Sequence, residues 1–369
     1  MDRPTVSVLI PAYNAEQYID EAIESVLNQT FQDFEIIVVN DGSTDETRTR
    51  LADYEDEPRI TVIDQDNAGP AAARNRCFNA SNGNFIAILD ADDRSRPRRL
   101  ELQSQRLEED SELGLVGSYA QKIKPGGDPL EILEVPLKHR EIAARIDDSN
   151  QFVHATVMMR RSVFEELGGY REDYPASEDY EFLRRATHNF QTANIPEVLY
   201  DYRIHGESNT FYALKQQKLY GLMTRHLAKQ NQSIDDFPEL LDTPLTRESL
   251  VEFGISPRRI DEKLFSSYKR RVRVLVGLGD FNGARQFAQK AAAHMEDSVL
   301  GAREEAILGI YQTILSLAEP NRQLSTGLIS LTRATLLSPA GALRAIKEWG
   351  HFGLYRVYST LSERDAPPS

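Results

Sequence analysis

Four apolar segments in the first ninety residues alternate with segments of helical periodicity, and this pattern constrains the fold more than any other feature. The apolar segments are residues 5–10, 34–40, 60–64 and 84–90. Near-continuous apolar runs of this length are typical of parallel strands buried on both faces. Strands that alternate with helices predict right-handed βαβ units, and therefore a mostly parallel sheet flanked by helices.

Two of the intervening helices carry start signals. Asn14, followed by Gln17 three residues later, matches a capping box, so we expect a helix to begin there. Pro70 is suited to the first helical position, so we expect another helix to begin at it. Gly69 precedes that helix and Arg74 lies one turn inside it. Free N–H groups at such a helix start favour a phosphate.

Polar residues follow each predicted strand. In a parallel sheet the carboxyl ends of the strands meet at one edge, where ligands of α/β proteins bind. We therefore expect a ligand site along this edge. The residues concerned are Pro11, Tyr13 and Asn14 after the first strand, 41–45 after the second, 66–69 after the third and 90–93 after the fourth.

The fourth strand runs directly into three carboxylates, Asp90, Asp92 and Asp93, in the segment "FIAILDADD". Carboxylates at the end of a buried strand are costly unless a cation or hydrogen-bond donors compensate them. Oxygen ligands of this kind suit Mg²⁺ or Mn²⁺. Alternatively, Asp92 or Asp93 caps the next helix, which we expect near Pro97. This segment alone leaves both interpretations open.

A second acidic pair opens the segment "SEDYEFLRR". Ser177 stands at an N-cap position, and Glu178 and Asp179 fall in the first helical turn, where acids are favourable for helix stability alone. The same pair can serve chemistry, and the local pattern does not decide between the two. Two histidines lie nearby in the chain: His154, and His205 after the last predicted strand of this part.

The charge balance limits the partners. The chain carries 57 acidic and 43 basic side chains, a formal net charge of −14, which argues against a broad nucleic-acid-binding face. The one cysteine, Cys77, excludes an intramolecular disulfide and favours a reducing compartment. The N-terminal segment shows no secretory signal. We therefore expect a cytoplasmic location.

The strand and helix alternation weakens after about residue 110, and helix signals dominate from about residue 213. We predict an α/β domain over 1–225 and a helical region over 226–369, which includes a helical hairpin turning at residues 279–283. The amphipathic tail at 334–361 can lie on the cytoplasmic face of a membrane or pack on its own domain. Homo-oligomerisation and acceptor binding also stay open for this region.

Together these segments resemble the inverting glycosyltransferases of family 2. The resemblance rests, in chain order, on "VSVLIPAYNAEQYIDEAIESVLNQTFQDFEIIVVNDGSTDET", "NAGPAAARN", "FIAILDADD" and "SEDYEFLRR". It covers about residues 5–210 and implies a GT-A type fold, an α/β structure with a Rossmann-like, mostly parallel sheet, followed here by a smaller helical C-terminal domain.

The resemblance also implies roles for particular residues. For the nucleotide sugar, the implied contacts are Pro11, Tyr13 and Asn14 bordering the uracil, Asp41 hydrogen-bonded to the base or ribose, Gly69 and Arg74 near the base or diphosphate, and Asp90 with Ala91 near the ribose. For catalysis, they are Asp92 as metal ligand, His205 on the metal or diphosphate, Asp179 as general base and Glu178 beside it. His154 lies where relatives contact the acceptor or the donor sugar.

The expected function is therefore a metal-dependent, inverting transfer of a sugar from a UDP-sugar to a hydroxyl of a glycan or lipid-linked saccharide, with Mn²⁺ or Mg²⁺ as cofactor. A dTDP-sugar stays open as donor. The alternative is a non-catalytic protein that binds a nucleotide sugar or glycan; the presence of both Asp92 and Asp179 favours the enzyme. A nucleotidyltransferase would show a Gly-rich, basic loop after the first strand, and "PAYNAEQY" lacks it. A glycosidase would need no nucleotide pocket.

Overall fold

The computed structural model describes residues 3–174, 176–205, 214–230, 232–241, 244–278 and 280–296. The chain divides into two compact units, which are described separately. The first comprises Met1–Ile204 with Thr224–Pro244, and the second His205–Met223 with Leu245–Ser369. The chain passes between the two units three times. The single domain boundary expected after residue 225 stays a prediction.

A nine-stranded sheet in the order β3-β2-β1-β4-β8-β6-β9-β5, with β7 paired to β6, forms the centre of the first unit. Strands β1, β2, β3, β4, β6 and β9 run in one direction, and β5, β7 and β8 run against them. The mostly parallel sheet predicted from the sequence is confirmed. The strands are β1 (Val6–Ala12), β2 (Phe34–Asp41), β3 (Ile60–Gln65), β4 (Phe85–Ile88), β5 (Arg94–Ser95), β6 (Leu113–Ile123), β7 (Pro129–Leu133), β8 (Met158–Arg160) and β9 (Gln191–Arg203).

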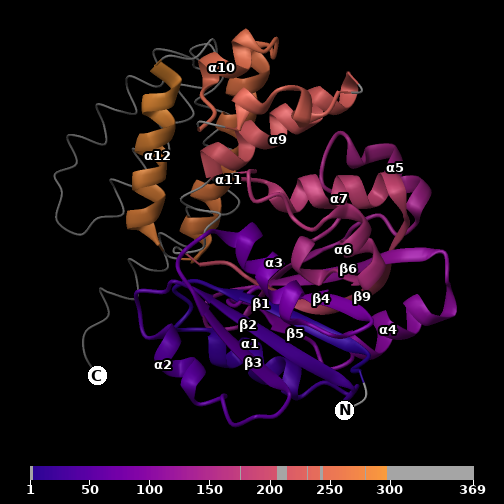
Figure 1. Ribbon diagram of the computed structural model, residues 1–369. Helices are drawn as coiled ribbons and strands as arrows, with labels where there is room; N and C mark the ends of the chain where they lie inside the picture. The colour runs from indigo at the N-terminus through magenta and orange to yellow at the C-terminus, as the bar shows by residue number, and fades with distance from the viewer. Residues whose placement is uncertain are drawn as a thin grey trace, which may run out of the picture. The chain divides into compact units, whose positions relative to one another are not determined.

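Helices cover both faces of this sheet, because its strands direct apolar side chains alternately to either side. In β1, Val8 and Ile10 pack in one core and Leu9 packs in the other. Figure 1 shows the two helical layers on either side of the sheet. One core includes residues of α1 (Ile19–Leu27), α2 (Thr47–Ala52) and α4 (Arg99–Glu109); the other includes residues of α3 (Pro70–Ala80), α5 (His139–Ile146), α6 (Arg161–Leu167) and α7 (Glu178–Asn189).

The two predicted helix starts have different outcomes. Helix α3 begins at Pro70, as predicted. Helix α1 begins at Ile19 with Tyr18 as N-cap and without a side-chain cap, so the capping box predicted at Asn14 is wrong. Asn14 instead has a left-handed backbone with φ 50°, and its Oδ1 accepts a hydrogen bond from the backbone N of Thr44 at 2.8 Å. Asn14 therefore links the loop after β1 to the loop after β2 and does not cap a helix.

The strand order creates a switch point between β1 and β4. The chain passes from β1 to β2 and β3 on one side, then returns to place β4 on the other side of β1. At such a point the connections diverge and leave a crevice beyond the carboxyl ends of the strands, where ligands of open α/β sheets bind. The acidic segment after β4 therefore leaves its strand at this position.

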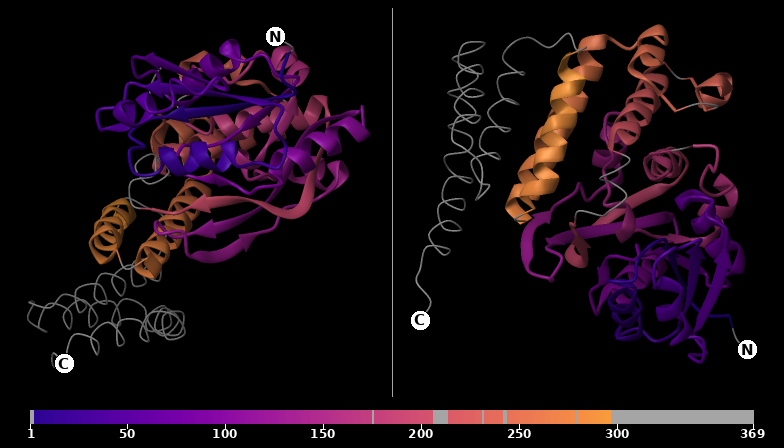
Figure 2. Two further views of the ribbon diagram at one scale, coloured as in Figure 1. Left: turned by 90° about the horizontal axis from the view of Figure 1, so that it is seen from below. Right: turned by 90° about the vertical axis from the view of Figure 1, so that its left-hand side faces the viewer.

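The second unit is helical in its described part. It contains α10 (Arg247–Glu252), α11 (Pro257–Leu278), α12 (Phe281–Glu296) and the first part of α9 (Leu214–Lys229). Helices α11 and α12 lie side by side as the predicted hairpin (Figure 2). None of the helices that the structure describes is long and apolar enough to cross a bilayer. The amphipathic tail at 334–361 lies outside the described residues.

Candidate active site

The acidic turn after β4, residues 90–93, is held by hydrogen bonds with residues of β9. The backbone N of Asp90 donates to the hydroxyl of Tyr200 at 3.2 Å, and the backbone N of Asp93 donates to the carbonyl of Asp90 at 3.1 Å. The carboxylate of Asp93, buried, accepts a hydrogen bond from the backbone N of Arg203 at 2.6 Å. Helix α4 begins later, at Arg99, without a side-chain cap, so capping does not explain the acids.

A buried arginine bridges two of the predicted site carboxylates. Arg74 Nη1 donates to Glu178 Oε1 at 2.7 Å, and Arg74 Nη2 donates to Asp90 Oδ1 at 3.3 Å. The side chains of Arg74 and Glu178 are only 8% and 11% exposed. The guanidinium also lies over the ring of Tyr170, 5.5 Å from its centroid. Residues from α3, from the turn after β4 and from α7 thus meet around one cation.

Asp179 adjoins this bridge in the first turn of α7. Burial and the negative charge of Glu178 raise the pKa of Asp179 to about 6, although Arg74 and a hydrogen bond from the backbone N of Tyr180 oppose the shift. That hydrogen bond is 2.7 Å long. A carboxylate with a pKa near neutrality is ionised often enough to accept a proton and basic enough to hold it.

Negative charge is in excess around the acidic turn. Burial raises the pKa of Asp90, and the neighbouring charge of Asp92 adds to the shift that Arg74 opposes. Burial together with the charges of Asp92 and Asp90 raises the pKa of Asp93 well above its usual range. These carboxylates are therefore compensated by too few donors, and a cation bound beside them would relieve the repulsion.

The predicted base-binding residues lie after β1 and β2. Tyr13 is 42% exposed, which is unusual for a large aromatic side chain in this protein. Asp41, by contrast, is buried and holds the loop before α3: Oδ1 accepts from Gln65 Nε2 at 2.7 Å and from the backbone N of Ala68 at 2.8 Å, and Oδ2 accepts from the backbone N of Gly69 at 2.9 Å. The expectation of free N–H groups in this loop is therefore wrong for Ala68 and Gly69.

The comparisons with known proteins identify a family. Residues 7–168 match the model of the family described as "Glycosyl transferase family 2". An uncharacterized glycosyltransferase of Haemophilus influenzae is 36% identical over 222 residues, which cover 56% of this chain and 68% of the relative. An uncharacterized glycosyltransferase of Methanocaldococcus jannaschii is 34% identical over 230 residues, covering 61% and 79%.

The chain belongs to glycosyltransferase family 2. A more distant relative, the chondroitin synthase of Pasteurella multocida, is 27% identical over 233 residues, 63% of this chain and 23% of that protein. The predicted α/β fold with a mostly parallel sheet is confirmed, and the protein is a transferase enzyme that acts in glycosyl transfer.

The residues of this glycosyltransferase fit a divalent ion that arrives with a diphosphate. Among the described residues, no group of three or more His, Cys, Asp or Glu side chains forms a ready-made metal site. An ion such as Mg²⁺ needs only one or two protein carboxylates when phosphates and water supply its other ligands. Asp92, half-buried in the turn, and Asp90 can provide them, so the metal role of Asp92 stays a prediction consistent with the charge excess.

The two histidines differ in their surroundings. His154 is buried, its Nε2 lies 2.8 Å from the hydroxyl of Tyr170, and burial with the nearby charge of Arg74 lowers its pKa well below 6.5. His154 is therefore neutral, and its hydrogen bond to Tyr170 connects it to Arg74, whose guanidinium lies over the Tyr170 ring. His205 belongs to the second unit, where its carbonyl accepts a hydrogen bond from Arg271 Nη2 at 2.8 Å. Its metal role stays a prediction.

Sequence reasoning missed Arg203. Its side chain is buried, its Nε donates to the carbonyl of Asp92 at 2.8 Å, and its Nη2 donates to Glu21 Oε2 at 2.7 Å. The arginine lies at the end of the last strand predicted in this part of the chain. No sequence signal singles it out, because a strand pattern does not reveal which polar side chains turn inward.

Proposed function

We propose that this glycosyltransferase transfers a sugar from a UDP-sugar to a hydroxyl of a glycan or lipid-linked saccharide, with inversion at the anomeric carbon and with the help of Mg²⁺ or Mn²⁺. The observation that carries the proposal is the convergence of Asp90, Arg74 and Glu178 beside Asp179. The chondroitin synthase relative supports a glycan as acceptor.

The proposed chemistry is a single displacement. Asp179 takes the proton of the acceptor hydroxyl while that oxygen forms a bond to the anomeric carbon from the face opposite the nucleotide, and the bond to the diphosphate oxygen breaks. The negative charge of Glu178, which pairs with Arg74, helps to raise the pKa of the neighbouring Asp179. Asp92 with Asp90 would hold a divalent ion, which would stabilise the charge that develops on the leaving diphosphate.

The exposed ring of Tyr13 is the proposed stacking surface for the nucleobase. An aromatic face supports stacking on uracil and on thymine alike, so a dTDP-sugar is the competing donor. Asp41 fixes the loop of Ala68 and Gly69 through hydrogen bonds and so contributes shape to this end of the site.

The pH dependence of transfer follows from Asp179. Because the base acts when ionised and its pKa is about 6, we expect kcat/KM to rise with pH, to reach half its maximum near that pKa and to level off above it. A pH-rate profile between about pH 5 and pH 8 checks this expectation, since kcat/KM reports groups of the free enzyme. A rate that stays flat through this range would contradict the assignment.

Donor and metal are tested together by thermal shift. We expect UDP or a UDP-sugar to raise the Tm of the full chain, because a ligand that binds only the folded state stabilises it, and we expect Mn²⁺ to be needed for the full effect. The probes are UDP, UDP-glucose, UDP-N-acetylglucosamine and dTDP-glucose, each with and without Mn²⁺. Asp92→Asn should lose the metal-dependent part, whereas Asp53→Asn, which changes the exposed C-cap residue of α2, should not.

Each part of the proposal has its own contradicting result. A rise in Tm with UDP that is the same with and without Mn²⁺ would contradict the role of Asp92 as a metal ligand. A rise in Tm with dTDP-glucose and with none of the UDP compounds would show that the donor is a dTDP-sugar. Binding without release of UDP in the presence of any acceptor would favour the non-catalytic alternative. The anomeric proton coupling of the product reports inversion or retention directly.

A further inference from the structure

A cavity lies at the amino ends of the parallel strands, on the edge of the sheet opposite the acidic turn. Thr5 and Asn84, which directly precede β1 and β4, line it. Arg160 also lines it and pairs with Phe85 at the beginning of β4. The cavity has a volume of about 530 Å³, within the range of roughly 300–1,000 Å³ that is typical of small-ligand sites. The length of β4 separates this cavity from the candidate active site.

Three arginine side chains line this cavity, and we call them the arginine cluster: Arg3, Arg160 and Arg161. Backbone carbonyls hold each guanidinium. Arg160 Nε donates to the carbonyl of Leu113 at 2.9 Å. Arg161 Nε donates to the carbonyl of Gly83 at 2.7 Å, and Arg3 Nε donates to the carbonyl of Asn82. A carbonyl oxygen orients a guanidinium but does not neutralise its charge.

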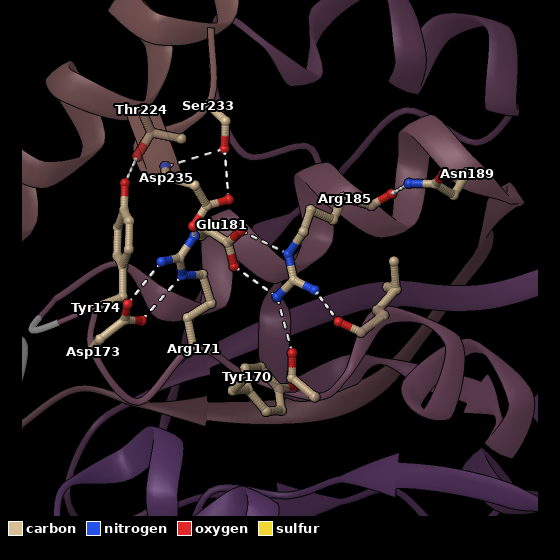
Figure 3. Close-up of polar contacts among 12 residues, drawn as sticks. Tyr170, Arg171, Asp173, Tyr174, Glu181, Arg185, Asn189, Thr224, Ser233 and Asp235 are labelled. Carbon is tan, nitrogen blue, oxygen red and sulfur yellow. Dashed lines mark hydrogen bonds and ion pairs between the residues drawn. The ribbon is translucent and has the colours of Figure 1, made fainter. Parts of the chain in front are cut away.

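No member of the arginine cluster forms an ion pair with a carboxylate in the part of the chain that the structure describes. Arg185 provides the contrast. It also donates to backbone carbonyls, those of Leu167 at 2.6 Å and Gly169 at 2.9 Å (Figure 3). Both carboxylate oxygens of Glu181 accept hydrogen bonds from Arg185 as well, at 2.6 and 2.8 Å. Arg185 is thus held and neutralised, whereas the arginine cluster is only held.

The positive charges of the arginine cluster repel one another. Burial, and then the charge of Arg3, lower the pKa of Arg161, and the charges of Glu165 and Glu35 oppose this shift. Glu165 and Glu108 line the cavity, but both are exposed and neither forms an ion pair among the described residues. The guanidinium groups therefore lack a close negative charge, which a bound anion would supply.

We propose that the arginine cluster binds the phosphate group of a small phosphorylated compound, at a site separate from the donor site. A phosphate monoester carries a charge of about −1.5 to −2 at pH 7, which suits three guanidinium groups better than the single charge of a carboxylate does. Arginine binds phosphate oxygens through paired N–H donors. Within the described ranges, Nη1 of Arg160 and Nη1 of Arg161 donate to no acceptor, so both are available.

The cavity also offers neutral polar groups. The side chains of Asn84 and Ser162 line it and have no hydrogen-bond partner among the residues that the structure describes, so they can bind oxygen atoms next to the phosphate. A soluble sugar phosphate and a lipid with a phosphate monoester as headgroup share the recognised group. The inference does not rest on the proposed function, because it uses no residue of the candidate active site.

The first test is isothermal titration calorimetry of the full chain with glucose 1-phosphate. Arg161→Gln should weaken binding by about ten- to a hundredfold, the loss expected for a hydrogen bond to a charged group. Arg3 is exposed, so Arg3→Gln should weaken binding by less than about fivefold. Arg76→Gln, the matched control, changes an exposed arginine of α3 outside the cavity and should bind like the wild-type protein.

A second variant should change the affinity in the opposite direction. Glu165→Gln removes a negative charge that lines the cavity and competes with the anion, so binding should strengthen by about two- to fivefold. Glu166→Gln, at an exposed neighbour that does not line the cavity, should leave the affinity unchanged. A gain of affinity does not arise from damage to the fold, so this pair of variants carries the test where Arg161→Gln does not fold.

Sedimentation with vesicles distinguishes the two sources of the phosphate group. The vesicles contain phosphatidylcholine with or without phosphatidic acid, whose headgroup is a phosphate monoester. Sedimentation that requires phosphatidic acid and is lost in Arg161→Gln would support the site and assign a lipid to it. Binding of glucose 1-phosphate without sedimentation would support the site and assign a soluble compound. If the wild-type protein binds neither probe, or if Arg161→Gln and Glu165→Gln both bind like the wild-type protein, the inference is wrong.

Discussion

Asp179→Asn should reduce kcat for sugar transfer by roughly 10²- to 10⁴-fold, the usual contribution of a general base. Asparagine has nearly the same shape, and its Oδ1 can still accept the hydrogen bond from the backbone N of Tyr180, but it cannot take a proton. Binding of UDP should be unchanged, because the proposed nucleotide contacts lie elsewhere. UDP release under saturating donor and acceptor measures the loss.

Stability should change in the opposite direction. The folded state raises the pKa of Asp179 to about 6, so it disfavours the ionised carboxylate, and at neutral pH that charge costs stability. A neutral asparagine removes this cost, worth about 3 kcal/mol for the shift from 3.8 to about 6, and should raise the Tm. A helix-capping acid would behave differently, since its loss lowers stability. Unchanged transfer in Asp179→Asn, beside an unaffected Asp53→Asn control, would refute the base assignment.

Arg74→Met should destabilise the folded protein by about 3–5 kcal/mol at neutral pH, because it leaves the buried carboxylate of Glu178 and the half-buried carboxylate of Asp90 without their cation. Methionine fills much of the same volume, so the effect is chiefly electrostatic. Arg74→Lys should recover only part, since a lysine cannot present two donors in a fork to two separate acids. Urea unfolding followed by circular dichroism provides the free energies.

The deficit of Arg74→Met should also depend on pH in a defined direction. Burial and the charge of Asp92 already raise the pKa of Asp90, and Arg74 opposes that shift, so without the guanidinium this pKa rises further above that of the unfolded chain. The variant is then least impaired at low pH, where Asp90 is protonated in either state, and loses stability as the pH rises through the folded pKa of Asp90. Arg48→Met, which breaks exposed ion pairs to Glu55 and Asp64, should cost less than about 1 kcal/mol. A pH-independent deficit would point to packing instead.

Local patterns predicted those parts of the molecule that depend on neighbours in the chain. The alternation of apolar runs predicted the parallel strands, Pro70 predicted the start of α3, and the polar strand ends predicted that Asp90 lies at one edge of the sheet. The contacts of Arg74 with Asp90 and with Glu178, 104 residues from it, were not predicted, because the resemblance implies only a nucleotide contact for Arg74 and no periodicity extends over such a distance.

The features that sequence reasoning missed all depend on long-range partners. Asn14 has the residue type and spacing of a helix cap, but its Oδ1 accepts a hydrogen bond from the backbone N of Thr44, which lies outside the helix. Gly69 opens α3 as expected, yet its N–H is bound by Asp41. Arg99, fully buried, donates to the carbonyl of Ile88 at 2.7 Å, and nothing in its helix distinguishes it from the exposed Arg98. Burial of a long cationic side chain is a property of the assembled fold.

The hydrogen bonds of Arg203 to Asp92 and Asp93 have a consequence for folding during synthesis on the ribosome. The first four parallel strands leave the exit tunnel long before residue 203, which lies 110 positions after its partner Asp93. A nascent chain can therefore form the part of the sheet made by β1, β2, β3 and β4 while the carboxylates of the acidic turn remain loosely ordered. The catalytic edge of the sheet is complete only when β9 emerges and joins the sheet. Arrested chains that end before this strand should accordingly be compact yet unable to retain UDP.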